Sequence, residues 1–299
     1  MLSISHSKPA LALLFLLTGA NVFAGTTLDR IKQSGSVVLG FREDSLPFSY
    51  KNAEQGAPLG YSIDVCNALV EAIRQETGSK SLAVKYVAVT GQTRIPSVVE
   101  GKIDFECGNS TNTKERRGKV AFSMPLYFAS AKMLVNEGSG ITKIDNLAGK
   151  TLAVENGSTG QQIAEKHKAS LPTMKVVIVP SSNAGVAAVE NKSADAFMTD
   201  DILLHAFKAQ SKEKLAVTGP TMSIEPLAIM FNKDDSELAT IVKKEMAHLT
   251  QTGQLRKLYT KWFQSPLAQR SFNLNVTPNP LTREILIRPS EYVEDWVVF

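Results

Sequence analysis

The chain has 299 residues, 43% of them hydrophobic, which is enough for one large core or two lobes. The 33 Lys and Arg residues and 29 Asp and Glu residues give a net charge of +4. Aromatic residues make up 7%, and no cluster of five or more basic residues occurs. The sequence therefore lacks the basic surface that is typical of a nucleic-acid-binding protein. Two cysteines and four scattered histidines supply no ligand set for a metal, and no motif predicts another cofactor.

The first 24 residues predict an export signal. Lys8 precedes an apolar run at residues 10–17, and small residues flank a cleavage site after Ala24. The run is shorter than the roughly 20 apolar residues that span a membrane, although a retained anchor is the alternative. We expect residues 1–24 to be removed, which takes the net charge from +4 to +3 because Lys8 is lost. The mature protein is then expected in the periplasm of a Gram-negative bacterium.

Strand and helix patterns alternate from residue 25 to about residue 124. The predicted elements are, in order, a strand at 36–41, a helix at 62–73, a strand at 82–89, a short helix at 94–101 and a strand at 103–107. Strands separated by helices of this length indicate parallel βαβ units rather than a sandwich of antiparallel sheets. This part of the chain therefore predicts one α/β lobe.

A polar segment at residues 108–113 follows the last of these strands and predicts a loop. Such a loop, at the carboxyl end of a strand, is where open α/β sheets bind ligands. Arg94 precedes it and Arg116 follows it, so two guanidinium groups could hold one small anionic ligand. The alternative is an ordinary turn between two solvated arginines.

The two cysteines, Cys66 and Cys107, fall on a buried helix face and a buried strand. If these surfaces pack together in an oxidising compartment, the cysteines could form a disulfide. Two buried free thiols are the alternative, because sequence spacing does not establish the separation of the Cα atoms.

The second half of the chain repeats the alternation and predicts a second α/β lobe. Its elements are a strand at 151–155, a helix that opens at 156–160 and runs to about 167, a strand at 175–179, a helix at 184–190, a strand at 195–198, a helix to about 210 and a strand at 215–218. Helices at 236–250 and 253–263 follow. The tail from Ser265 is rich in Pro and Asn and predicts no element.

Two apolar extended segments, at residues 124–129 and 223–230, could carry the chain between the lobes. Lobe 1 is then discontinuous and comprises residues 25–128 and 229–299. Lobe 2 comprises residues 129–228, and the ligand cleft lies at a two-strand hinge.

Several segments together carry a resemblance to a known family. They are residues 27–31 (TLDRI), 40–50 (GFREDSLPFSY), 60–64 (GYSID), 94–96 (RIP), 104–108 (DFECG), 115–116 (ER) and 196–201 (AFMTDD). Over essentially its whole mature length, the chain resembles the periplasmic solute-binding proteins of polar amino-acid ABC importers, and most closely their glutamate/aspartate-binding members. The resemblance implies an α/β fold of the two-lobed, type II periplasmic-binding-protein kind, with a two-strand hinge.

The resemblance also implies roles for individual residues. Arg116 and Thr111 match the groups that hold the α-carboxylate of the ligand, and Ser158 and Thr159 match a helix N-terminus that adds donors. Asp200 matches the carboxylate that takes the α-ammonium group. Opposite charges on facing walls are what a bound zwitterion requires.

Arg42 and Arg94 match the groups that select the side chain of the ligand. Two guanidinium groups at this place would repel a cationic side chain and attract a second carboxylate, which points to L-glutamate or L-aspartate. The alternative for each arginine is a structural ion pair with Glu43, Asp44 or Glu106.

Some positions depart from the glutamate/aspartate-binding pattern. Gly91 and Ser182 stand where that pattern has Ser and His, and Asn109, which we expect to line the site, replaces a Ser of the polar loop. The cysteine that the pattern carries on the return strand is missing from residues 224–231. The preference among glutamate, aspartate and another acidic or amide ligand is therefore left open.

The expected function is that of a monomeric receptor, not an enzyme, which closes on an acidic L-amino acid and docks on the inner-membrane permease of an ABC importer. The catalytic alternative is a cyclohexadienyl dehydratase, because such enzymes resemble this fold; Glu43, Asp44 or Glu155 would then be the general acid. A ligand-sensing partner of a chemoreceptor would share the same binding chemistry.

Overall fold

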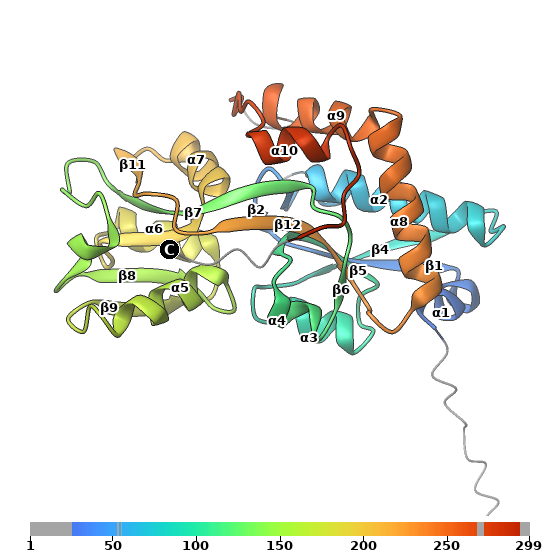
Figure 1. The fold of residues 1–299 in the computed structure, drawn as a ribbon, viewed down its shortest axis with the longest axis horizontal. Helices are drawn as coiled ribbons and strands as arrows, with labels where there is room; N and C mark the ends of the chain where they lie inside the picture. The colour runs from blue at the N-terminus through green and yellow to red at the C-terminus, as the bar shows by residue number, and fades with distance from the viewer. Residues whose placement is uncertain (1–25, 53, 55, 268–271, 294–299) are drawn as a thin grey trace, which may run out of the picture.

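The computed structural model describes residues 26–52, 54, 56–267 and 272–293, so the predicted signal sequence lies outside the described residues. Two α/β lobes lie side by side, and two long strands, β7 and β12, cross between them (Figure 1). In the described part of the chain, no helix combines the length and the apolar character that a membrane crossing requires.

The first lobe is built on a parallel core of three strands. β1 (Ser36–Phe41) lies between β4 (Ala83–Ala88) and β5 (Phe105–Thr111), and helices α2 (Tyr61–Glu76) and α3 (Arg94–Val99) connect the strands. The predicted strands and helices between residues 36 and 107 are thus confirmed. The remaining elements of this lobe are α1 (Thr27–Ser34), a ribbon of β2 (Asp44–Ser45) and β3 (Ser49–Tyr50), α4 (Lys114–Arg117), β6 (Ala121–Phe122), α8 (Ser236–Gln251), α9 (Gln254–Tyr259), a π-helical segment (Thr260–Gln264) and α10 (Pro280–Ile285).

The second lobe has the same design. β8 (Thr151–Glu155) lies between β9 (Lys175–Val179) and β10 (Ala196–Asp200), parallel to both, and α5 (Thr159–Lys168) and α6 (Ser182–Glu190) make the connections. A 3-10 helix (Ile144–Leu147), α7 (Asp201–Gln210) and β11 (Leu215–Thr218) complete it. The elements predicted between residues 151 and 218 are confirmed, with shifts of a few residues at their ends.

The hinge is an antiparallel pair of strands. β7 (Tyr127–Asn136) and β12 (Ile224–Phe231) pair with Ile224 opposite Ser130. β12 then pairs with β5, and β7 with β10 and β11, so the sheet has the order β4-β1-β5-β12-β7-β10-β8-β9. The crossing segment predicted at 223–230 is confirmed as β12, whereas only residues 127–129 of the segment predicted at 124–129 lie in a strand, β7. The lobe boundaries predicted after residues 128 and 228 fall inside these strands and stay a prediction.

Aromatic side chains fasten the hinge to the first lobe. The ring of Tyr127, at the start of β7, stacks on Tyr259 and Phe263 with centroid distances of 6.3 and 5.2 Å, and Phe48 packs edge-on at 5.5 Å. All four side chains are buried. Because a fully buried aromatic side chain contributes roughly 1.5–3 kcal/mol, this cluster holds one end of β7 firmly.

The C-terminal tail, for which the sequence predicts no element, forms α10 and reaches the hinge. The Asn279 side chain caps the helix by accepting the N–H of Thr282 (2.8 Å), and Pro280 occupies the first helical position. Thr282 Oγ1 accepts the N–H of Phe128 (3.0 Å), and Asn279 Nδ2 donates to the Phe128 carbonyl (2.7 Å). The tail therefore satisfies both backbone groups of a residue in β7.

Cys66 and Cys107 form a disulfide, with their Cα atoms 6.2 Å apart. The bond joins the buried face of α2 to β5. Of the two possibilities that the sequence allows, the disulfide is confirmed, and it fixes the strand that carries Asn109 and Thr111.

The prediction of a polar loop at residues 108–113 is wrong for most of this segment. β5 continues to Thr111, and all seven of its residues are buried. It continues because β12 pairs along its edge, with Ala228 opposite Ser110, and because Ser110 Oγ donates to Glu106 (2.6 Å). Tertiary pairing thus overrides the turn-forming tendency of Asn, Ser and Thr.

Candidate functional site

The candidate site lies where strands of both lobes end. Arg42 follows β1 and Thr111 ends β5, while Glu155 ends β8 and Asp200 ends β10. The carboxyl ends of parallel strands form the usual ligand-binding edge of an open α/β sheet. They enclose a cavity of about 20 Å³ between the lobes, lined by Arg42, Arg94, Asn109, Thr111, Glu155, Ser158, Thr159, Thr199 and Asp200. Of the predicted ligand residues, only Arg116 is missing from this lining; it lines a neighbouring hollow of about 790 Å³ that shares Ser158.

Arg116 is a buried guanidinium that is held by backbone carbonyls. Thr113 caps α4 by accepting the Arg116 N–H (3.2 Å), which orients the residue at the end of β5. Nη1 donates to the Thr111 carbonyl (3.0 Å) and Nη2 donates across the cleft to the Gly157 carbonyl (3.1 Å). Burial lowers the pKa of Arg116, although the Glu225 carboxylate opposes this effect. A ligand carboxylate would supply the close counter-ion that these carbonyls do not provide.

Arg94, the first residue of α3, has even fewer partners. Nη2 donates to the Gly157 carbonyl (3.3 Å), and the buried Nε has no hydrogen-bond partner among the described residues. Burial, together with the positive charges of Arg116 and Arg42, lowers its pKa to about 9. A buried cation in this situation is stabilised by any anion that enters the cavity.

Asp200 is the corresponding anion on the wall of the second lobe. Its Oδ2 accepts a hydrogen bond from Asn109 Nδ2 (2.9 Å), so these two predicted site residues contact each other directly. Burial, together with the nearby Glu225 carboxylate, raises the pKa of Asp200 to about 8. The buried Asn109 Oδ1 has no partner among the described residues. An ammonium group could donate to both oxygens.

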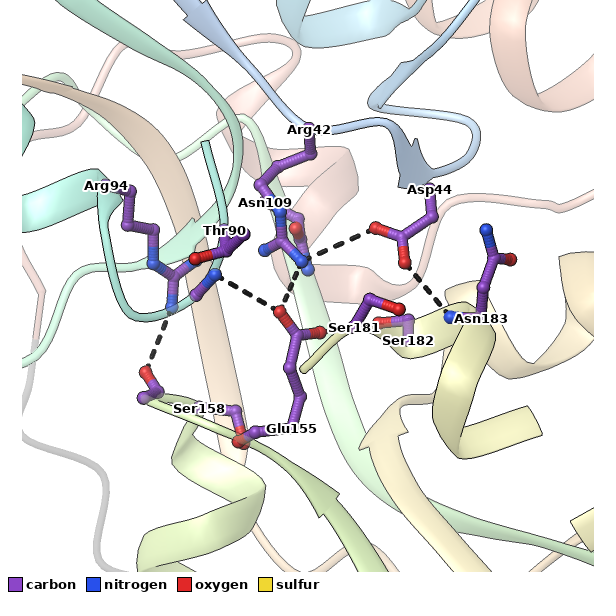
Figure 2. Close-up of polar contacts among 12 residues, drawn as sticks. Arg42, Asp44, Thr90, Arg94, Asn109, Glu155, Ser158, Ser181, Ser182 and Asn183 are labelled. Atoms are coloured by element: carbon purple, nitrogen blue, oxygen red, sulfur yellow. Dashed lines mark hydrogen bonds and ion pairs between the residues drawn. The ribbon is translucent and has the colours of Figure 1, made fainter. Parts of the chain in front are cut away.

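Arg42 is, by contrast, already paired. Its Nη2 forms an ion pair with Glu155 across the cleft, and Asp44 Oδ1 lies 3.5 Å away (Figure 2). Burial alone would lower the pKa of Arg42, but the carboxylates of Glu155 and Asp44 outweigh it and raise the pKa. Of the ion pairs that the sequence suggested as alternatives, the one with Asp44 therefore exists, and Glu43 instead faces Lys51 at the surface (3.5 Å).

The N-terminus of α5 closes the cavity from the second lobe. Ser158 caps this helix, because its Oγ accepts the N–H of Gln161 (3.0 Å) and donates to the Glu155 carbonyl (2.7 Å). Thr159 is the first helical residue. The Ser158 hydroxyl is thus used within the lobe, and a ligand would meet the N-terminal backbone donors and the positive end of the helix dipole.

Glu155 and Ser182 are functional candidates for which the sequence suggested no binding role. The Glu155 carboxylate accepts from Arg42, Gly91 and Ser182, and Asp44 Oδ2 accepts the N–H of Asn183 (3.0 Å), which adds another contact between the lobes. The signal that could have found Glu155 is its place at the carboxyl end of a strand, directly before an Asn-Gly turn. Within the described residues, no group of three or more His, Cys, Asp or Glu could hold a metal ion.

Comparison with known proteins identifies the family of this chain. Residues 37–265 match the bacterial extracellular solute-binding proteins, family 3. The glutamate/aspartate import solute-binding protein of Escherichia coli K12 is 32% identical over 295 residues (95% of this chain, 97% of the relative), and the L-glutamate/L-aspartate-binding protein of Pseudomonas aeruginosa is 33% identical over 268 residues (89% of each). The glutamine-binding protein GlnH of Bacillus subtilis is 29% identical over 245 residues (81% of this chain, 86% of the relative).

Solved structures of amino-acid-binding proteins have a similar fold. A mutant of the T. maritima protein ArgBP has a TM-score of 0.72 at 27% identity and covers 80% of this chain and 100% of its own. The ancestral amino-acid-binding protein AncCDT-1, a precursor of cyclohexadienyl dehydratase, has a TM-score of 0.67 at 30% identity and covers 80% and 99%. The relatives are named for binding and import, so the expectation of a binding protein rather than an enzyme is confirmed. The chain belongs to the family 3 bacterial extracellular solute-binding proteins and is a solute-binding component of an amino-acid ABC importer.

Proposed function

We propose that this chain is the periplasmic receptor of an ABC importer for acidic L-amino acids, L-glutamate and L-aspartate. The observation that carries the proposal is Arg94, a buried guanidinium without a carboxylate partner among the described residues, in a cavity that also contains Asp200. The names of the E. coli and P. aeruginosa relatives support the same class of ligand.

Each group of such a ligand has a complementary residue. The α-carboxylate meets Arg116, Thr111 and the N-terminal donors of α5, and the α-ammonium group meets Asp200. The side-chain carboxylate then meets Arg94. Charge-assisted hydrogen bonds of this kind, shielded from water, supply affinity and fix the orientation of the ligand.

Closure of the lobes completes the site. The Gly157 carbonyl accepts from Arg94 and Arg116, and Asn109 donates to Asp200, so residues of both lobes surround the ligand only when the cleft is shut. Bending at the β7–β12 pair turns binding into a change of shape, which the inner-membrane permease can recognise. The protein acts as a monomer in this scheme.

Isothermal titration of the mature protein, refolded after removal of bound ligand, tests the proposal. L-glutamate, L-aspartate, L-glutamine, L-arginine and L-histidine are titrated in parallel. Tight binding of both acids, abolished in Arg116→Ala, is the expected result. Binding of L-arginine or L-histidine without binding of either acid would refute the acidic specificity, and wild-type affinity in Arg116→Ala would refute the position of the α-carboxylate.

A further inference from the structure

The Glu155 carboxylate lies in the middle of the site and is bound as the carboxylate of a ligand would be. Oε1 accepts from the Arg42 guanidinium and from the Gly91 N–H (3.2 Å), and Oε2 accepts from the Ser182 hydroxyl (2.7 Å). Figure 2 shows Glu155 rising from the second lobe toward Arg42 of the first. A guanidinium, a backbone N–H and a hydroxyl are suitable donors for a buried carboxylate. The protein thus places its own carboxylate beside two arginines that were expected to select a ligand carboxylate.

Gly91 has no side chain, and this arrangement leaves no room for one. A Cβ atom at this position would lie 2.4 Å from the Asn156 carbonyl oxygen and 2.9 Å from Glu155 Oε1, closer than such atoms approach in proteins. The lack of a side chain therefore allows Glu155 and Asn156 to pack against the first lobe. Gly91 and Ser182 are two positions at which the sequence departs from the glutamate/aspartate-binding pattern, and both contact the Glu155 carboxylate.

The charge of Glu155 changes what the side-chain end of the cavity can accept. Arg42 already lies between the carboxylates of Glu155 and Asp44. A cavity of about 20 Å³ holds about one water molecule, so a ligand side chain at this place must displace Glu155 or lie against it. A second carboxylate there is repelled by the first, whereas a carboxamide can donate its N–H to Glu155 and accept from Arg94 with its oxygen.

We propose that Glu155 is a specificity-determining residue, an internal carboxylate that competes with the side-chain carboxylate of the ligand for Arg42 and so admits side-chain carboxamides. The inference rests on the proposed function, because it assumes an amino acid whose α-groups are held by Arg116 and Asp200. L-glutamine and L-asparagine are therefore ligands of the wild-type protein, together with the two acids.

The test is the ratio of affinities for each acid and its amide, measured by isothermal titration for L-glutamate, L-glutamine, L-aspartate and L-asparagine. Glu155→Gln frees Arg42 to bind the side-chain carboxylate of an acid and removes the carboxylate that accepts from the amide. The ratio of affinities should therefore change in favour of the acids by about tenfold or more, which is the effect of one hydrogen bond to a charged group. Glu165→Gln is the matched control, because it removes the same charge from an exposed residue of α5 at the cleft edge. Its ratio should equal that of the wild type.

A second variant keeps the test independent of the folding of Glu155→Gln. Ser182→Ala removes one donor from Glu155 and leaves every charge in place, so it should move the ratio in the same direction by a smaller factor. An unchanged ratio in Glu155→Gln, or an equal loss of affinity for acids and amides, would overturn the inference and leave the proposed function standing. If neither acids nor amides bind to the wild type while other amino acids do, the proposed function itself fails.

Discussion

Asp200→Asn should have opposite effects on stability and on binding. The substitution keeps the shape of the side chain and an oxygen that accepts from Asn109, but it removes the charge that the α-ammonium group of the ligand needs. In the protein without ligand the same charge is unfavourable, because burial and Glu225 raise the pKa of Asp200 to about 8.

The magnitudes follow from these surroundings. Removing one partner of a buried, hydrogen-bonded charge pair costs about 2–5 kcal/mol, so the dissociation constant should rise by roughly 30-fold to 5,000-fold. The rise in the pKa of Asp200 from 3.8 to about 8 means that the ionised carboxylate destabilises the folded protein by at most about 6 kcal/mol. The raised pKa means that this penalty is absent below about pH 4, grows as the pH rises and is complete above about pH 8.

Titration calorimetry and thermal unfolding between pH 4 and pH 9 measure the two effects. Without ligand, Asp200→Asn and the wild type should have equal stability at pH 4, and the variant should become the more stable protein as the pH approaches 8. Asp201→Asn is the matched control, since the Asp201 carboxylate accepts backbone N–H groups of Ser130 (3.1 Å) and Ile202 (2.8 Å) and lines no part of the cavity. It should keep its affinity. Undiminished affinity in Asp200→Asn, or lower stability than wild type at pH 8, would refute the reasoning.

Three further predictions concern neighbouring features. Arg94→Gln should weaken the binding of acids by about 10-fold to 150-fold, the range for a hydrogen bond to a charged group, and should affect amides less; equal losses for both in titration calorimetry would contradict its role. Gly91→Ala should weaken the binding of every ligand, because its Cβ would lie 2.4 Å from the Asn156 carbonyl oxygen when the lobes close, and small-angle scattering with saturating ligand should show a more open particle. Replacing both Cys66 and Cys107 by Ala should lower the free energy of unfolding by about 4 kcal/mol in urea titrations, given a sequence separation of 41 residues; a change near zero would mean that the disulfide does not restrict the unfolded chain.

Most of the fold could be predicted because its helices and strands are encoded locally. Apolar periodicity identifies α2, β4, α3 and the elements of the second lobe, and the alternation of strand and helix predicts parallel pairing. The error at residues 108–111 has a different origin. A run of Gly, Asn, Ser and Thr favours a turn in isolation, and only the edge of β12, more than a hundred residues away, makes it a strand.

The charged residues of the candidate site could be predicted from the sequence, but the ion pairs that they form could not. The sequence and the resemblance single out the arginines at 42, 94 and 116 and the carboxylate of Asp200, and the structure gathers three of these four residues around one cavity with Arg116 beside it. The partner of Arg42 is Glu155, 113 positions along the chain and in the other lobe. Such a pair depends on how two lobes meet, which no local pattern encodes.

Because α10 is attached to the hinge and not to the cavity, changes in α10 should alter the strength of ligand binding without altering its selectivity. Residues 37–265 match the family, yet Asn279 and Thr282 lie beyond this range and hold the backbone of Phe128 in β7. We expect a change at these contacts to alter how often the lobes are shut, and the apparent dissociation constant of every ligand depends on that fraction. Substitutions in the tail should therefore multiply all affinities by one common factor, while the order of preference among ligands stays with the residues of the cavity. The sensitivity of such a receptor can then be adjusted to the supply of nutrient without a new choice of nutrient.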